Sequence, residues 1–348
     1  MNPYIMASLL FSLLLGTTIT MSSSHWLMAW MGLEINTLAI LPLMAQHHHP
    51  RAIEATTKYF LTQATAAALL LFAGTTNAWE SGQWELQQIT HPLPATMMII
   101  ALALKIGLAP LHTWLPEVLQ GLDLKTGLIL ITWQKLAPLT LLIQLQPNNP
   151  TLIICLGLLS VLVGGWGGLN QTQLRKILAY SSISHLGWMA LVLQFSPTLT
   201  FLTLMLYFVM TISVFLVFLT NKTTTINSLA MSWAKAPILT SLMPLALLSL
   251  GGLPPLTGFA PKWLILQELT KHGLAPAATL AALSALLSLY FYLRLSYAMS
   301  LTIAPNNLMN TIPWRPLTPQ PNMVTATMIT SSVLLLPLTP EALSLLIP

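Results

Sequence analysis

The chain alternates long apolar runs with short polar connectors from one end to the other. Each run is close to the roughly 20 apolar residues that an α-helix needs to cross a bilayer. The pattern predicts an all-α, polytopic membrane protein with about eleven spans, two of them broken by glycine and proline. The approximate span cores are Tyr4–Thr20, Trp26–Met44, Tyr59–Thr75, Ala95–Leu115 (broken), Thr126–Leu145, Leu152–Leu169, Ile177–Gln194, Leu199–Leu219, Ile238–Leu266 (broken), Ala275–Tyr297 and Val324–Leu345.

The two broken spans carry the same motif at the break. Residues 104–117 read LKIGLAPLHTWLPE and residues 252–262 read GLPPLTGFAPK, with a shift of 145 positions between them. Interrupted helices in corresponding places of two halves are the strongest sequence indication of a transport site. The matched pairs are Gly107/Gly252, Leu108/Leu253, Pro110/Pro255, Leu111/Leu256, Trp114/Phe259 and Pro116/Pro261.

Composition agrees with this prediction and excludes a soluble domain of the same size. Apolar residues make up 55% of the 348 and charged residues 6%, and the mean hydropathy is +0.74. A soluble surface needs far more charge than this. The pI of 9.4 does not indicate nucleic-acid binding, because the 13 basic residues are scattered and form no patch.

Basic residues fall almost entirely in the connectors that follow even-numbered spans. The connectors after odd-numbered spans hold Lys271 alone among basic residues, and one of them carries Glu80 and Glu85. Basic connectors stay on the negative side of an energised membrane, which predicts the N-terminus on that side and the C-terminus on the other. The basic residues of the even connectors are Arg51, Lys58, Lys125, Arg175, Lys176, Lys222, Lys235, Arg294 and Arg315.

Four ionisable residues do not belong to the connectors. Glu34, Lys105 and Lys135 lie inside predicted spans, and Lys262 follows the break in the ninth. Each costs about 2.5–3.5 kcal/mol at bilayer depth on insertion scales, so the four together cost roughly 10 kcal/mol. One such residue alone could be a snorkelling lysine or part of a structural pair, whereas the set of four favours a proton or ion path.

Burial suits such groups to passing protons. A low-dielectric setting disfavours the charged form of an amine or a carboxylate, so gaining and losing a proton become comparable in energy near neutral pH. The break at Gly107 would add flexibility and water beside Lys105. His112 could relay a proton or be an ordinary hydrogen-bonded histidine near a helix end. His185, close to three serines, fits either a hydrated path or a structural hydrogen-bond cluster.

The remaining motifs indicate neither a metal centre nor redox chemistry within this chain. Cys155 is the only cysteine, so no internal disulfide or cysteine-based cluster can form. His47–His49 predict a polar loop, with adventitious metal binding as the alternative. Residues 164–168, GGWGG, lack the spacing of a dinucleotide fingerprint and predict close helix packing instead.

Several longer stretches resemble one family over the full length of the chain. The chain is similar to the mitochondrially encoded, antiporter-like membrane subunits of NADH:ubiquinone oxidoreductase (respiratory complex I) of vertebrates. The stretches that carry this resemblance are Met1–Pro3, Trp30–Asn36, Glu54–Phe60, Lys105–Pro116, Leu174–His185 and Gly252–Phe259.

The resemblance implies two inverted five-helix repeats, each with one broken helix, and a further C-terminal helix. The corresponding domains are residues 1–148, 149–300 and 301–348. Bacterial relatives carry additional spans at the N-terminus, and a form without them agrees with the span count here. The second repeat departs from the first at Leu250, where Lys105 has no lysine counterpart, so one complete channel is expected.

The resemblance also assigns roles to the buried ionisable groups. Glu34 and Lys105 match the glutamate and lysine of the family's pumping pair. Lys135 matches the central-axis lysine, and Lys262 matches the exit-side lysine on the second broken helix. His112 and His185 match further polar positions along the axis.

Three functions follow as hypotheses. The first is proton translocation within complex I, with FMN, iron–sulfur clusters and ubiquinone held by other subunits and no cofactor or metal in this chain. It predicts the mitochondrial inner membrane, with the N-terminus in the matrix and the C-terminus in the intermembrane space. Its partners would be other membrane-arm and accessory subunits and lipids, with cardiolipin as a candidate, and no nucleic acid. The alternatives are a stand-alone cation/proton antiporter subunit and a passive membrane spacer.

Overall fold

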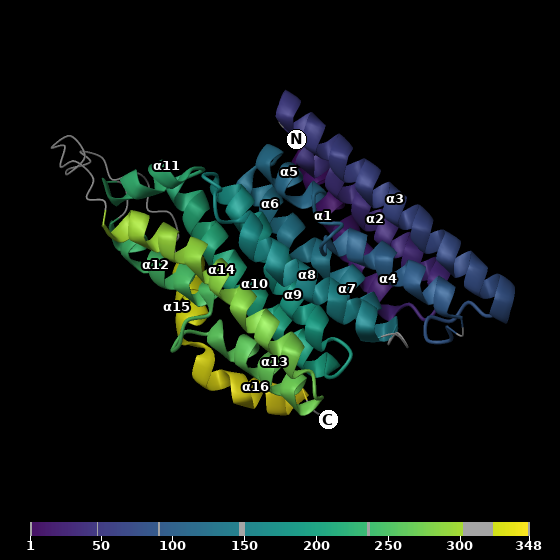
Figure 1. Ribbon diagram of the computed structural model, residues 1–348. Coiled ribbons are helices and arrows are strands. Elements are labelled where there is room, and N and C mark those ends of the chain that lie inside the picture. The colour runs from purple at the N-terminus through teal and green to yellow at the C-terminus, as the bar shows by residue number, and fades with distance from the viewer. Residues whose placement is uncertain are drawn as a thin grey trace. The chain divides into compact units, whose positions relative to one another are not determined.

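The computed structural model describes residues 2–46, 48–89, 91–145, 150–234, 237–301 and 323–346. Over these residues the protein is helical and contains no β-strand, only two isolated β-bridges (Figure 1). The predicted all-α class is therefore confirmed. His47, Lys235 and Arg315, which entered the predictions above, lie outside the described residues.

The chain forms two compact units, residues 1–160 and 161–348. The boundary between them falls inside α8 (Pro150–Gly167). The other helices of the first unit are α1 (Pro3–Ser22), α2 (Trp26–Met44), α3 (Pro50–Ser81), α4 (Pro92–Ile106), α5 (Trp114–Gly121), α6 (Leu124–Ile131) and α7 (Trp133–Leu145).

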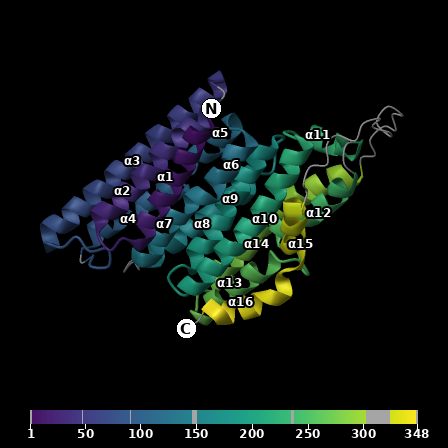
Figure 2. The ribbon, with the colours of Figure 1, turned by 180° about the vertical axis from the view of Figure 1, so that it is seen from behind.

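Helices α1, α2 and α3 lie side by side in both views of the molecule (Figures 1 and 2). At the crossing of α1 and α2, a Cβ on Gly16 or Gly32 would lie 2.8 Å from the carbonyl oxygen of the other. Small residues allow helices to approach closely in a membrane, where no hydrophobic effect drives their association. The Asn36 side chain also packs on Gly16, so this crossing fixes one polar side chain of α2.

Helix α3 begins at Pro50, well before the apolar core that the sequence predicts from Tyr59. Proline at the first position favours a helix start, and His49 caps the helix by accepting from the Arg51 amide at 3.3 Å. Arg51 and Lys58, expected in a connector, therefore lie in the first turns of a helix. The prediction missed this because these turns are amphipathic rather than uniformly apolar.

The first broken helix stops at Ile106 and resumes at Trp114. Gly107 ends α4 with a φ of 83°, a left-handed conformation that glycine adopts without strain. The amides of Gly107 and Leu108 both donate to the Ala103 carbonyl, at 2.8 and 2.9 Å. The last carbonyls of α4 consequently lose their usual amide donors and are open to side chains.

The second unit continues from the end of α8. Its helices are α9 (Leu174–Val192), α10 (Pro197–Asn221), α11 (Ile226–Ala230), η1 (Met231–Ala234), α12 (Pro237–Gly251), α13 (Phe259–Lys271), α14 (Ala275–Ser300), α15 (Met323–Leu334), η3 (Leu336–Leu338) and α16 (Thr339–Leu346). Helix α8 packs on α9 through glycines, as residues 164–168 predict. A Cβ on Gly164 would lie 2.7 Å from the Ser184 amide nitrogen, and one on Gly167 would meet the Tyr180 ring.

The second broken helix repeats the local structure of the first. Helices α12 and α13 begin 145 positions after α4 and α5 (Pro92 to Pro237, Trp114 to Phe259). Gly252 has a φ of 77°, and the Leu253 amide donates to the carbonyl five residues earlier at 3.4 Å. Helices α2 and α9 also correspond, with both ends separated by 148 positions. The repeated motif therefore has the same backbone conformation in each unit.

Seven helices of the described residues are long and apolar enough to cross a membrane, or eight if the bent pair α15 and α16 is one span. Two shorter apolar helices are the first halves of the broken spans. A multi-pass membrane protein is thus supported, and the count of eleven stays a prediction. The last predicted span differs from a continuous helix, because α15 and α16 meet at 66° where Pro337 interrupts the backbone bonding.

Candidate functional site

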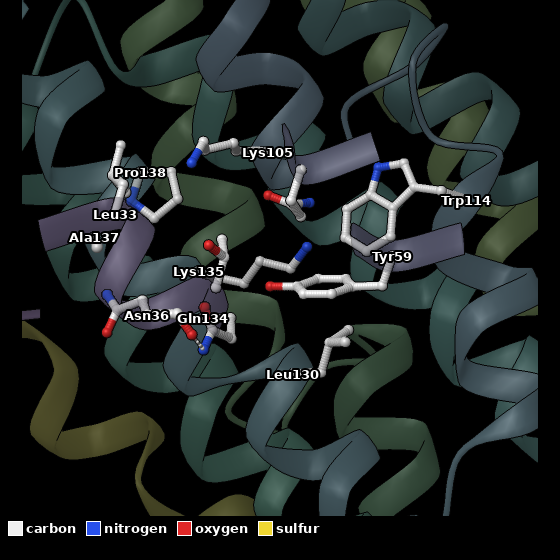
Figure 3. Close-up of a pocket in the computed structure, with 12 residues that line it drawn as sticks. Leu33, Asn36, Tyr59, Lys105, Trp114, Leu130, Gln134, Lys135, Ala137 and Pro138 are labelled. Carbon is white, nitrogen blue, oxygen red and sulfur yellow. Dashed lines mark hydrogen bonds between the residues drawn. The ribbon is translucent and has the colours of Figure 1, made fainter. Parts of the chain in front are cut away.

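Side chains from six helices of the first unit surround a small cavity (Figure 3). About 10 Å³ of it is open to the centre of a water molecule, close to the roughly 10–15 Å³ that one water requires. The polar lining residues are Asn36, Thr37, Tyr59, Gln63, Lys105, Gln134 and Lys135, and the apolar ones are Leu33, Trp114, Leu130, Ala137 and Pro138.

Lys105 occupies the last turn of α4 and is 4% exposed. Among the described residues its Nζ has no hydrogen-bond partner, and the same holds for Gln63 Nε2 and both polar side-chain atoms of Asn36. Buried polar atoms are costly unless they are hydrogen-bonded. Unpaired polar atoms gathered at a water-sized cavity make this region chemically suited to ordered water.

Lys135 enters from α7 and is 1% exposed. Its ammonium donates to the backbone carbonyl of Ile106, at the end of α4. Its Nζ also lies 5.2 Å from the ring centroid of Trp114, and it points toward that ring in Figure 3. A carbonyl acceptor and an aromatic face both stabilise a buried cation. The break thus leaves Lys135 an acceptor without a helical amide donor, because the residue four positions after Ile106 is Pro110, which has no N–H.

Glu34 is half-buried on α2 and accepts a 3.1 Å hydrogen bond from the Thr37 hydroxyl. Its charge lies within electrostatic reach of Lys105 and Tyr59. In the described part of the chain, no direct hydrogen bond joins Glu34 to Lys105. The structure therefore places these two residues in a through-space interaction rather than in a closed ion pair.

His112 lies in the break between α4 and α5 and is half-buried. Its Nδ1 is 3.2 Å from the carbonyl oxygen of Pro110, two residues earlier. His112 is not among the residues that line the cavity. His112 thus contacts a backbone carbonyl, and its role as a proton relay stays a prediction.

In the second unit, Lys262 of α13 reaches back to the end of α12. Its Nζ donates to the Gly251 carbonyl at 2.7 Å, and its aliphatic chain packs on Gly252, where a Cβ would lie 2.9 Å from Cδ. His185 of α9 is within electrostatic reach of Lys262 and interacts with the backbone of Leu250. The second break therefore gathers its own lysine and a histidine.

Two buried tyrosines accompany His185. The ring centroids of His185 and Tyr207 are 5.4 Å apart. The hydroxyls of Tyr207 and Tyr292 are buried without a hydrogen-bond partner in the described segments. Ser182 neighbours Tyr207 and Ser181 neighbours Tyr292, but both serine hydroxyls donate to carbonyls of their own helix. His185 thus belongs to a polar cluster and not to an isolated contact.

The structure brings the predicted residues into two groups, one in each unit. Glu34, Lys105 and Lys135 converge on the first break, and His185 and Lys262 on the second. The sequence did not single out the aromatic and amide partners. Two of them, Tyr59 and Tyr207, could have been found from the internal repeat. They are 148 positions apart, which is also the offset between α2 and α9. The partners that were missed are Tyr59, Gln63, Tyr207 and Tyr292, whereas Trp114 was named as a position of the repeated motif without a role.

Metal-ligating side chains are sparse in the described ranges. No group of three or more His, Cys, Asp or Glu residues among them could hold a metal ion. Cys155 is a free, exposed cysteine on α8. His49, a member of the histidine run, serves as the cap of α3.

Two family models together match most of the chain. Residues 23–288 match the model described as NADH:quinone oxidoreductase/Mrp antiporter, TM, and residues 289–343 match NADH dehydrogenase subunit 2 C-terminus. The chain is also 82% identical over 345 residues to NADH-ubiquinone oxidoreductase chain 2 of Tetraodon nigroviridis, covering 99% of each. This chain belongs to the NADH-ubiquinone oxidoreductase chain 2 family. Its identity to the chain 2 proteins of Salmo salar and Squalus acanthias is 66% and 62%, over 99% and 98% of each chain.

Chains of three solved complexes are similar in structure to this chain 2 family member. A chain of respiratory complex I from Thermus thermophilus with bound Aureothin is 31% identical, with a TM-score of 0.84, over 97% of this chain and 78% of that one. A membrane-bound sulfane sulfur reductase, an archaeal respiratory membrane complex, is 18% identical with a TM-score of 0.84, over 97% and 74%. The Mrp complex from Dietzia sp. DQ12-45-1b is 16% identical with a TM-score of 0.80, over 97% and 75%. At such identity the last two share the fold alone.

Proposed function

We propose that this chain is a proton-translocating membrane subunit of NADH-ubiquinone oxidoreductase in the mitochondrial inner membrane. The observation that carries the proposal is the presence of two buried lysines, Lys105 and Lys135, at one water-sized cavity beside a broken helix. The names of the relatives and the likeness to a chain of Thermus complex I support the assignment to this enzyme.

The two lysines differ in a way that suits proton transfer. Lys105 has no protein partner among the described residues, so its charge depends on the cavity and on the field of Glu34. Lys135 has a carbonyl and an aromatic face that stabilise its ammonium form. In our proposal, a change in the field at Glu34 releases the proton of Lys105, which passes through water in the cavity to Lys135. Lys262 and His185 serve a later step of the same path.

The finer features of the family belong to this proposal as well. We infer two inverted five-helix repeats, eleven spans, the N-terminus in the matrix and the C-terminus in the intermembrane space. The internal offsets of 145 and 148 positions support the repeats. In this proposal FMN, iron–sulfur clusters and ubiquinone reside in partner subunits, and other membrane-arm subunits and lipids surround this chain.

The test uses the whole complex reconstituted in vesicles. Glu34→Gln and Lys105→Ala should abolish coupled proton translocation, because each removes one charge of the interacting pair. Lys271→Ala is the matched control, since Lys271 is an exposed lysine paired with Glu268 in the last turn of α13. An unchanged ratio of protons to electrons in both site variants would refute the assigned roles.

A second candidate is a stand-alone cation/proton antiporter subunit, because the description of the family model that matches residues 23–288 also names the Mrp antiporter. Purification separates the two functions. Recovery together with flavin- and iron–sulfur-containing partners supports the first, and ion exchange without electron transfer supports the second.

A further inference from the structure

Trp114, the first residue of α5, contacts groups of three other helices near the break of the first unit. Its indole Nε1 donates to the Leu104 carbonyl of α4 at 3.1 Å. Its ring centroid is 5.2 Å from Lys135 Nζ and 5.8 Å from the centroid of the Tyr59 ring, which it meets edge-on. Trp114 is only 6% exposed, so these contacts define its environment.

The indole N–H bonds a carbonyl that the helix break has freed. In a continuous helix the Leu108 amide would donate to Leu104, but here it donates to Ala103. Trp114 supplies the missing donor. Because the donor belongs to α5 and the acceptor to α4, this bond ties the two half-helices together.

The indole ring acts on Lys135. A cation–π contact stabilises the ammonium and not the neutral amine, because only the cation interacts strongly with the ring quadrupole. The second support of the ammonium is the Ile106 carbonyl of α4. One support therefore comes from each half of the broken helix, so a shift of α5 relative to α4 changes the stability of the charged form.

Helix α5 is also anchored on its outer side. Glu117, one turn after Trp114, accepts from Lys58 Nζ of α3 at 2.8 Å, and Lys58 also pairs with Glu54 at 2.8 Å. Gly121 packs directly on the Arg51 carbonyl of α3. The position of the Trp114 ring is thus set by contacts with both α3 and α4.

We propose that Trp114 is a positioning residue for proton transfer, which holds the Lys135 ammonium at the break and makes its protonation depend on the relative placement of α4 and α5. This inference rests on the proposed function of Lys135. In this proposal the ring stabilises the Lys135 ammonium, and the indole N–H links α5 to α4.

The test compares three variants of the whole complex in vesicles, at equal amounts of assembled enzyme. Trp114→Leu removes the ring and the N–H, and should lower the rate of proton translocation about threefold or more, the lower part of the range that cation–π contacts support. Trp114→Phe keeps an aromatic face and should recover part of this loss. Trp133→Phe is the matched control, because the Trp133 N–H on α7 is buried without a partner in the described residues.

The number of protons moved per NADH separates positioning from a structural role. A merely destabilised complex would lose assembly and electron transfer together and keep this ratio, whereas displacement of Lys135 lowers the ratio in the assembled complex. Equal losses in Trp114→Leu and Trp133→Phe, or a normal ratio in Trp114→Leu, would overturn the inference. If Lys135→Met also pumps normally, the proposed function itself fails; if only Lys135→Met is impaired, the role of Trp114 alone fails.

Discussion

Lys262 donates a 2.7 Å hydrogen bond from its Nζ to the carbonyl oxygen of Gly251, the last residue of α12. Lys135 donates in the same way to Ile106, the last residue of α4, and the two acceptors are 145 positions apart in the sequence. The donors do not correspond, because Lys135 comes from α7 and Lys262 from α13. The two breaks are therefore equivalent in the carbonyl that ends the first half-helix, and each unit supplies a lysine to this carbonyl from a different helix.

Replacing Lys135 by methionine should reduce coupled proton translocation by about tenfold or more, since a positioned acid–base group typically contributes at least this much. The reason is that methionine fills similar space but carries no proton. Vesicle acidification driven by NADH is the measurement. Lys125→Met, an exposed lysine at the start of the neighbouring α6, should pump normally. A pumping Lys135→Met complex would contradict the assignment.

Lys262→Met should likewise impair pumping, and here the comparison lies within one helix. Lys271, nine residues later on α13, is exposed and pairs with Glu268 at 2.7 Å. Its replacement by methionine removes the same charge from the chain but touches neither Gly251 nor the break. Proton flux per NADH should fall in the first variant and stay unchanged in the second. Equal flux in both would mean that the location of Lys262 has no functional consequence.

Gly252→Ala should act on Lys262 as well as on the backbone. Alanine at a φ of 77° costs about 1–2 kcal/mol, and its Cβ would displace the Lys262 side chain, whose Cδ and Nζ lie 2.9 Å away. Gly273→Ala is the control, because Gly273 has a φ of 73° and no described atom would contact its Cβ. Both variants should lower the thermal midpoint of the purified complex, but only Gly252→Ala should lower proton flux. Normal pumping by Gly252→Ala would show that pumping does not require the hydrogen bond between Lys262 and the Gly251 carbonyl.

Two helical glycines should respond to alanine with opposite signs. A Cβ on Gly164 would lie 2.7 Å from the Ser184 amide of α9, so Gly164→Ala should destabilise this helix packing by about 1–3 kcal/mol. A Cβ on Gly74 of α3 would meet Trp26 at an ordinary 3.8 Å, so Gly74→Ala should be neutral or stabilise by up to about 1 kcal/mol. Unfolding of the detergent-solubilised complex measures both. A loss of stability in Gly74→Ala equal to that in Gly164→Ala would show that the local space is not the deciding factor.

The structure also corrects the lengths of elements that the sequence predicts in outline. Apolar runs predicted the seven helices of the described residues that are long enough to cross a membrane, but α3 extends back to Pro50 because its first turns bury only one face. The predicted span from Thr126 is divided at Thr132 between α6 and α7, where the Thr132 hydroxyl donates to the Leu128 carbonyl and Pro138 follows within two turns.

The sequence by itself determined the all-α membrane class, the two breaks and the presence of four ionisable residues in or beside predicted spans. These are local properties, since apolar length, a glycine with positive φ and a proline act within a few residues of themselves. Only the tertiary structure decided which groups those residues meet. Lys135 bonds a carbonyl 29 positions away, and Glu34 does not close an ion pair with Lys105. Such contacts depend on how helices far apart in the sequence pack, which periodicity and composition do not encode.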